Sequence, residues 1–264
     1  MGLFDFLSGK GNLEKTVKTA NAKNGQSADR YRALERLRDE ATDESVAGML
    51  RRFTWNYDKT IEDEQEKEWV FDQVVELGSH KAHEGDDADT RAVKEQTRAL
   101  VLRQLEKAMM SAETIAWPLK ILQRLAPGDE GWPHLEKVIE ANDNSYVRDP
   151  SRKIQLITHL GEHFTDERVA REMLQYLEDV DETVRFATAC ALGHQKNEEV
   201  AREPLLRLLL SKDEESRRIK VRILELLAEL GWNTHGFKGE VEQTLSDYSG
   251  FSLDGKGRIK RHGK

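Results

Sequence analysis

The chain has 264 residues, of which 34% are charged and 38% are hydrophobic, and its formal net charge is −8. No apolar run approaches the roughly 20 residues of a membrane-spanning helix, and the acidic balance argues against general binding to nucleic acid or anionic membranes. The single cysteine, Cys190, excludes an internal disulfide framework and favours a reducing compartment, so we expect a cytoplasmic protein. Because Cys190 lies between two alanines in a helical pattern, we expect it to be a small core residue.

Residues 1–11 carry a short apolar stripe followed by glycines. The apolar residues are Leu3, Phe4, Phe6 and Leu7. Their pattern predicts a flexible segment that packs on the first helices. The alternative is peripheral membrane contact, although four apolar side chains give only marginal membrane affinity. We expect no secretory signal, because a basic start and a cleavage site are missing.

The apolar spacing is helical from residue 12 to residue 141. We expect helices over 13–22, 28–39, 44–53, 62–77, 91–109, 111–125 and 135–141. Pro118 must begin or kink the helix that contains it, because proline removes a backbone donor. The polar stretch 79–90 predicts a linker.

The second half of the chain shows a more regular pattern. We expect helices over 151–161, 166–178, 181–193, 198–210, 215–230 and 240–245. The connections between most of them are short, which favours antiparallel neighbours. Residues 251–260 then alternate apolar and polar around a glycine-rich turn, which predicts a β-hairpin that caps the last helices.

One segment of the second half occurs twice in register. Residues 153–161 and 185–193 both begin with a cation, carry apolar residues at helical spacing and end in Leu-Gly, and the second copy follows 32 residues after the first. Such an offset indicates a stacked array of helices. We therefore predict an α-solenoid over 12–248, with its best repeats over 150–231, followed by a hairpin and basic tail over 249–264.

The run Asp-Glu-Thr-Val-Arg-Phe-Ala-Thr-Ala-Cys-Ala-Leu-Gly over 181–193 resembles the second helix of a HEAT repeat, particularly the HEAT-like repeats of the phycobilin-lyase type. The chain as a whole resembles a group of uncharacterised bacterial HEAT-repeat proteins. This resemblance implies an all-α fold, a right-handed superhelix of about five or six helix pairs, and no particular activity. Bilin chemistry would rest on fold analogy alone, which is a poor warrant.

Charged residues recur at the starts of the repeat helices. They form three acid–cation sets, namely Asp149 with Lys153, Asp181 with Arg185, and Asp213 with Arg218. We expect each cation to pair with the aspartate of its own or the neighbouring repeat. Such exposed pairs form a structural ladder rather than a ligand site, and each contributes less than about 1 kcal/mol.

Two metal sites are considered and set aside. A di-iron hydroxylase of the deoxyhypusine type uses several His-Glu pairs on its repeat helices, whereas this chain has one, at His83 and Glu84 in the linker. The same linker holds further possible ligands, namely His80, Asp86, Asp87 and Asp89. Their spacing does not define a coordination geometry, so a solvated linker is the simpler interpretation. We expect no metal and no cofactor.

Nucleic-acid binding is the main alternative function. DNA glycosylases of the alkylpurine type resemble this architecture and use a basic face with aromatic residues. The available cations are Arg152, Lys153, Arg185, Arg217, Arg218, Lys220 and Arg222, and the aromatics are Trp69, Trp117 and Trp132. The ladder explains three of these cations structurally, and the net charge argues against this alternative.

The aromatic and acidic stretch 55–69 is the best candidate for a partner surface. Acidic residues near the start of a helix are favoured by its dipole, but aromatic residues beside charge are typical of interface anchors. The expected partner-binding residues are Trp55, Tyr57, Glu62, Glu66 and Trp69. With no catalytic constellation in the sequence, we predict a non-enzymatic scaffold or adaptor that binds another protein.

Overall fold

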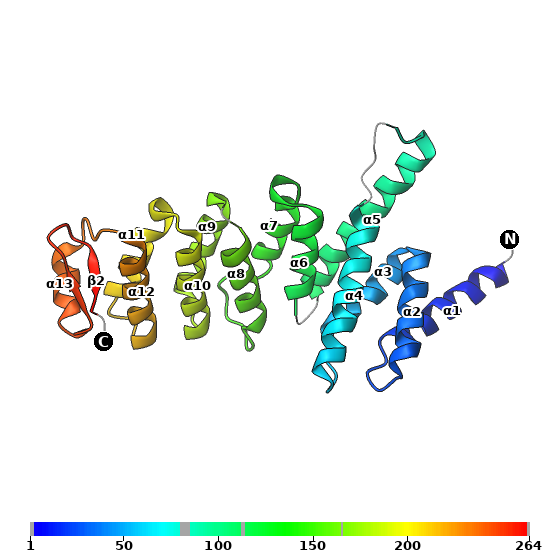
Figure 1. Cartoon of the computed structure of the whole chain (residues 1–264), viewed down its shortest axis with the longest axis horizontal. Helices are drawn as coiled ribbons and strands as arrows, with labels where there is room; N and C mark the ends of the chain where they lie inside the picture. Colours follow the sequence, from blue (N-terminus) through cyan, green and yellow to red (C-terminus); the bar gives the residue numbers. More distant parts are fainter. Residues whose placement is uncertain (1–2, 80–84, 112–113, 165, 263–264) are drawn as a thin grey trace. The chain divides into compact units, whose positions relative to one another are not determined.

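The fold is described from a computed structural model, which covers residues 3–79, 85–111, 114–164 and 166–262, with backbone alone for residues 3–10. Within these ranges the chain forms thirteen α-helices, three 3₁₀ helices and one two-stranded hairpin, so the all-α prediction is confirmed (Figure 1). The expected apolar side chains Leu3, Phe4, Phe6 and Leu7 lie outside the described residues. So do the linker residues His80, His83 and Glu84.

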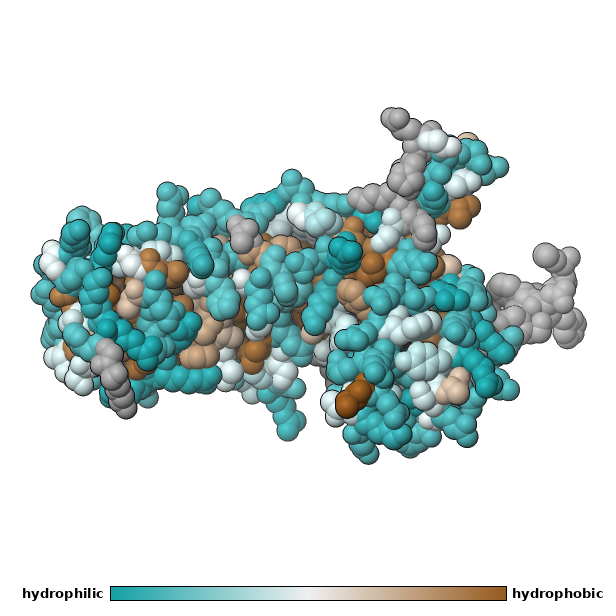
Figure 2. All heavy atoms as spheres, viewed as in Figure 1, coloured by the Kyte–Doolittle hydropathy of each residue, from teal (hydrophilic) through white to brown (hydrophobic). Residues whose placement is uncertain are grey.

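Contacts between residues divide the chain into two units, Met1–Ala141 and Asn142–Lys264. The array over 12–248 stays a prediction. In the ranges described, no helix combines the length and the apolar character that crossing a bilayer requires. The face of the molecule in Figure 2 is largely hydrophilic, and hydrophobic residues show in small areas between the charged ones.

The first unit is built of seven α-helices in its described residues. They are α1 Leu3–Ala20, α2 Ser27–Glu40, α3 Asp43–Leu50, α4 Thr60–Ser79, α5 Ala88–Ser111, α6 Ala116–Leu125 and α7 Trp132–Glu140, with 3₁₀ helices η1 Arg51–Thr54 and η2 Gly128–Glu130. The helix α1 begins at Leu3 and not at the predicted residue 13, so the glycines at 9 and 11 do not interrupt it. Pro118 lies in the first turn of α6, where its missing N–H is tolerated.

The core of the first unit lies between α2, α3, α4, α5 and α6. Leu34, Leu37, Met49, Val70 and Leu105 have no exposed surface. The helix α4 contacts α2, α5 and α6, so it is the central element of this unit. The inner face of α4, which includes Val70 and Val74, is buried.

The second unit alternates helices between two layers. Its elements are α8 Ser151–His163, α9 Glu167–Met173, η3 Leu174–Glu178, α10 Glu182–Gln195, α11 Glu198–Leu210, α12 Arg217–Leu230, α13 Lys238–Leu245, β1 Phe251–Leu253 and β2 Ile259–Arg261. The helices α8, α10 and α12 lie side by side, α9 and α11 pack against this row, and α13 contacts α11 and β1 at the end of the unit (Figure 1). Their shared core includes Leu160, Leu192, Leu206 and Ile223, none of which is exposed.

The repeated Leu-Gly sequence has a packing role in this unit. A Cβ on Gly161 would lie 2.6 Å from Ala191 Cα of α10, and a Cβ on Gly193 would lie 2.4 Å from Leu226 Cδ2 of α12. Each glycine therefore allows its helix to approach the next helix of the same layer. The two copies of the sequence occupy equivalent places, as the offset of 32 residues indicated.

The predicted hairpin is present at the end of the second unit. Strands β1 and β2 pair antiparallel, with Leu253 opposite Ile259. Asp254 Oδ1 accepts from the backbone N–H of Lys256 and Arg258, and Gly257 has φ +72°, which suits glycine in the turn. Strand β2 contacts α12, and Ile259 is 1% exposed. The hairpin thus packs on the last helix of the front layer.

Candidate functional site

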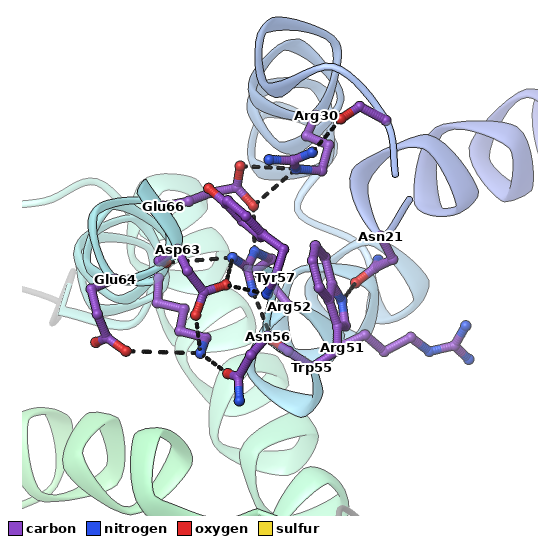
Figure 3. Close-up of polar contacts among 12 residues, drawn as sticks. Asn21, Arg30, Arg51, Arg52, Trp55, Asn56, Tyr57, Asp63, Glu64 and Glu66 are labelled. Atoms are coloured by element: carbon purple, nitrogen blue, oxygen red, sulfur yellow. Dashed lines mark hydrogen bonds and ion pairs between the residues drawn. The ribbon is translucent and has the colours of Figure 1, made fainter. Parts of the chain in front are cut away.

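Five charged side chains are buried together in the first unit (Figure 3). Arg30 belongs to α2, Arg52 to η1, and Asp63, Glu66 and Lys67 to α4. None of the five is more than 4% exposed. Burying a charge is costly unless it is paired and hydrogen-bonded, so the arrangement of these groups decides whether this unit is stable.

The phase of α4 explains how three of these groups come to be buried. Asp63, Glu66 and Lys67 lie three and four residues apart, in line with the core residues Val70 and Val74. Positions at this spacing share one face of a helix. The charged half of the face meets Arg30 and Arg52, whereas its apolar half enters the core.

Glu66 is the centre of the buried ion cluster. Its two carboxylate oxygens accept hydrogen bonds from Arg30 Nε at 3.2 and 3.0 Å, and Oε1 also accepts from Arg52 Nε. Arg52 Nη2 donates to Asp63 Oδ1 at 2.5 Å, and Lys67 Nζ donates to Asp63 Oδ2 at 2.7 Å. Burial acts to raise the pKa of Asp63, but the hydrogen bonds from Lys67 and Arg52 prevail and lower it below its ordinary value.

Two aromatic side chains cover the cluster. The guanidinium carbon of Arg52 lies 4.0 Å from the centre of the Trp55 ring, and that of Arg30 lies 4.7 Å from the centre of the Tyr57 ring. Trp55 Nε1 donates to Asn21 Oδ1 at 3.3 Å, which fixes the indole against the end of α1. The rings therefore stack on cations of their own chain through cation–π contacts (Figure 3).

This geometry corrects the expected partner surface at one position. Glu66 is 0% exposed, so it cannot contact a partner. Glu62 is exposed and pairs with Lys59 at 2.9 Å. Trp69 is half-buried and meets Tyr31 edge to face, with ring centres 5.7 Å apart. The acidic residues of this stretch thus lie on two faces of α4, one exposed and one buried.

The buried ion cluster joins three separate elements of the first unit. Its three cations and two carboxylates link α2, η1 and the start of α4, and the covering rings limit access from solvent. Groups that are fully engaged with one another are poorly placed to bind a substrate. We interpret the cluster as a structural element of the first unit.

The second unit has two hollows on the face formed by α8, α10 and α12. The hollow between α8 and α10, here called the apolar hollow, has a volume of about 280 Å³. Its lining residues are Ile154, Thr158, Gly161, Glu162, Thr183, Phe186, Ala187, Cys190, Ala191, His194 and Arg218. The hollow between α10 and α12, here called the arginine hollow, has a volume of about 430 Å³. Its lining residues are Phe186, Arg217, Arg218, Val221, Arg222 and Glu225.

Phe186 and Arg218 form the boundary between the two hollows. They line both, and the guanidinium carbon of Arg218 lies 3.7 Å from the centre of the Phe186 ring. Phe186, Cys190 and His194 are four residues apart and share one side of α10, while Val184 and Leu192 lie in the core. This row on α10 therefore lines the apolar hollow, and Phe186 alone of the three also lines the arginine hollow.

The arginines of the arginine hollow are only loosely paired with carboxylates. Arg218 lies 3.5 Å from Glu182, and Arg222 lies 3.4 Å from Glu225. The guanidinium of Arg217 stacks on Tyr248 at 5.1 Å. The Arg218–Glu182 pair is exposed at both members and contributes little free energy, so the guanidinium of Arg218 can turn to a new anion at small cost. Arg222 is less exposed and also lies 3.4 Å from Glu229.

The cations of the expected ladder pair with acids, but not with the predicted ones. Lys153 Nζ lies 2.7 Å from Asp179 Oδ2, and Arg185 Nε lies 2.7 Å from Glu214 Oε2. Lys153, Asp179 and Glu214 are nearly inaccessible, which also corrects the expectation of solvated pairs. Burial opposes ionisation of Glu214, but the hydrogen bond from Arg185 lowers its pKa below the ordinary value.

The predicted aspartates have a different role at the helix starts. Asp181 Oδ1 accepts from the backbone N–H of Thr183 at 2.8 Å and caps α10. Asp149 Oδ1 accepts from the N–H and the hydroxyl of Ser151 at the start of α8. Asp213 is exposed, and its N–H donates to Ser211 Oγ at 3.2 Å. Asp181 and Asp149 have short side chains that reach N–H groups of a first turn, whereas α12 is capped by Ser216 and not by Asp213. The pairs that span neighbouring repeats use longer side chains.

Sequence reasoning missed the apolar part of this face. We expected Cys190 in the core, but it is only partly buried and lines the apolar hollow. Phe186 was not singled out at all. The spacing of Phe186, Cys190 and His194 was visible in the sequence, but a half-exposed apolar residue has the same periodicity as a buried one.

Among the residues that the structure describes, no group of three or more His, Cys, Asp or Glu side chains is arranged to hold a metal ion. The chain matches no protein-family model, and no curated protein matches it. The function is therefore inferred from the geometry of the two hollows.

Proposed function

We propose that this protein is a non-catalytic interaction scaffold or adaptor, built on HEAT-like repeats, that binds another protein through the α8, α10 and α12 face. The observation that supports this most is the pair of adjoining hollows along α10, where Phe186 and Val221 are half-exposed between arginines. Partly exposed aromatic and arginine side chains on packed helices are the usual anchors of protein interfaces.

The repeat architecture is part of the same proposal. Equivalent close approaches at Gly161 and Gly193 support HEAT-like stacking of α8, α10 and α12 in a right-handed solenoid. Stacked repeats present extended, preorganised surfaces, which suit binding better than chemistry. A cytoplasmic location belongs to the proposal too, and the single cysteine supports it.

The proposal is tested by affinity capture with the full chain. Wild-type protein, Phe186→Ala and Arg171→Glu are immobilised and exposed to an extract of the source cells. Arg171 is exposed on α9, so its variant controls for a change of surface charge outside the proposed face. We expect a protein captured in stoichiometric amount by wild type and by Arg171→Glu, and lost with Phe186→Ala. Capture that does not depend on Phe186 would place the interface elsewhere, and turnover of a small molecule by the purified chain without any stoichiometric partner would refute the function.

Nucleic-acid binding is the second candidate, because three arginines gather around Phe186 in the arginine hollow. The three tryptophans expected for base stacking, at 69, 117 and 132, belong to the other unit. A mobility-shift assay at two salt concentrations tests this candidate, since the affinity of a protein that binds phosphates falls steeply with salt.

A further inference from the structure

We propose that the arginine hollow binds an acidic peptide segment of the partner that carries an aromatic or large aliphatic side chain. This inference rests on the proposed function and specifies its ligand. It follows from the apolar floor of the hollow, from the arginines at its rim and from the carboxylates beside these arginines.

The floor of the arginine hollow is apolar. Phe186 of α10 and Val221 of α12 are half-buried and face the hollow, whose volume of about 430 Å³ lies in the range of small-ligand sites. An apolar side chain of a peptide would remove the exposed parts of both residues from water. Area of this kind is the main source of affinity at the centre of an interface.

The rim of the hollow has an excess of positive charge. Three guanidinium groups, from Arg217, Arg218 and Arg222, line the hollow with one carboxylate, that of Glu225. Glu182 and Glu229 lie beside two of these arginines, and Arg261 lies 3.0 Å from Glu225, so four guanidinium groups meet three carboxylates. Two of them are oriented by the rings of Tyr248 and Phe186, so a carboxylate finds donors that are already in place. Arginine binds carboxylates in a bidentate manner, and Asp and Glu side chains of a peptide would replace pairs that are now 3.4 Å or longer.

Carboxylates on the same face limit the ligand to a short anionic segment. Glu162 lines the apolar hollow, Glu182 lies beside Arg218, and Glu229 lies 3.4 Å from Arg222. The phosphate backbone of a nucleic acid needs a continuous run of cations, which these acids interrupt. Two or three peptide carboxylates fit between them, so the charges favour an acidic peptide over nucleic acid.

The adjoining apolar hollow indicates that the bound peptide would run from α12 toward α8. Phe186 and Arg218 belong to both hollows, and the apolar floor continues through Ala187 and Cys190 of α10 to Ile154 of α8. A peptide anchored in the arginine hollow can therefore place a second apolar side chain toward α8. Alternating pockets of this type are a common means of reading extended segments.

The experiment measures fluorescence anisotropy with the full chain and three labelled probes. The first is a peptide in which a phenylalanine is flanked by Asp and Glu, the second has Lys at every acidic position, and the third is a single-stranded oligonucleotide. The proteins are wild type, Arg218→Glu, Phe186→Ala and the control Arg171→Glu. Arg218 has a side chain 55% exposed, so its variant remains folded even if Phe186→Ala does not.

We expect saturable binding of the acidic peptide alone. Arg218→Glu and Phe186→Ala should weaken it at least about tenfold, and Arg171→Glu should leave it unchanged. Binding of the lysine peptide, preferential binding of the oligonucleotide, or equal binding by all variants would overturn the inference. If the acidic peptide does not bind but the Phe186-dependent capture of a partner succeeds, this inference is wrong and the proposed function stands. If both fail, both are wrong.

Discussion

Replacing Glu66 by glutamine tests the account of the first unit most severely. Glu66 is 0% exposed and holds both Arg30 and Arg52, so the change E66Q keeps the shape of the side chain and removes its charge. The cluster would then contain three cations and one carboxylate, and the new amide N–H groups would face guanidinium donors. Breaking a buried pair by removing one partner costs about 3–5 kcal/mol. That is a large part of the roughly 5–15 kcal/mol that stabilises a typical domain.

Urea unfolding followed by tryptophan fluorescence measures this loss. Four of the five tryptophans, at 55, 69, 117 and 132, lie in the first unit, so the signal reports mainly on it. With a urea dependence of about 2 kcal/mol per M, we expect the midpoint to fall by about 1.5–2.5 M. The matched control is E62Q on the exposed edge of the same helix, which should leave the midpoint unchanged. A midpoint for E66Q equal to that of E62Q would refute the interpretation of the cluster as a structural element.

Two further predictions concern pH and helix packing. The pKa of Asp63 is lowered in the folded chain, so its ionised carboxylate contributes fully to stability above the unfolded pKa of about 3.8. This contribution is lost as the pH falls through the lower pKa of the folded chain. Unfolding midpoints measured between pH 2 and pH 7 should therefore drop at the acid end, and the drop should be smaller in Asp63→Asn. Gly193→Ala should destabilise the second unit by about 1–3 kcal/mol, because its Cβ would meet Leu226 at 2.4 Å. Gly239→Ala, in open space on α13, should be neutral or slightly stabilising in the same thermal unfolding experiment.

The repeat helices were predictable because their signals are local. The capping residue Asp181 acts within one turn, and the helices over 150–231 lie close to the expected positions, although α8 and α10 continue two residues past the glycines at 161 and 193. The ladder partners were not predictable, because Asp179 and Glu214 reach their cations only after α8, α10 and α12 have packed.

Which acids of the stretch 55–69 are buried was predictable in part. The spacing of Asp63, Glu66, Val70 and Val74 places all four on one face of a helix, which indicates that two of the acids are turned inward. Their cationic partners could not be found in this way. Arg30 has the pattern of a surface arginine until the start of α4 is placed beside α2.

The same distinction applies to the proposed binding face. Arg217, Arg218 and Arg222 were recognisable as a cluster from their spacing on α12 alone. Their association with Phe186 required knowledge of which side of α10 faces α12, and that depends on the close approach at Gly193.

Photo-crosslinking in cells shows whether the α8, α10 and α12 face binds a partner protein. A photoreactive residue is placed at Val221 in the arginine hollow, and in a second protein at Arg171 on α9. The account predicts that Val221 crosslinks in cells to one partner protein through an acidic segment, while position 171 does not. Crosslinks from position 171 to that partner, or none from position 221, would contradict it.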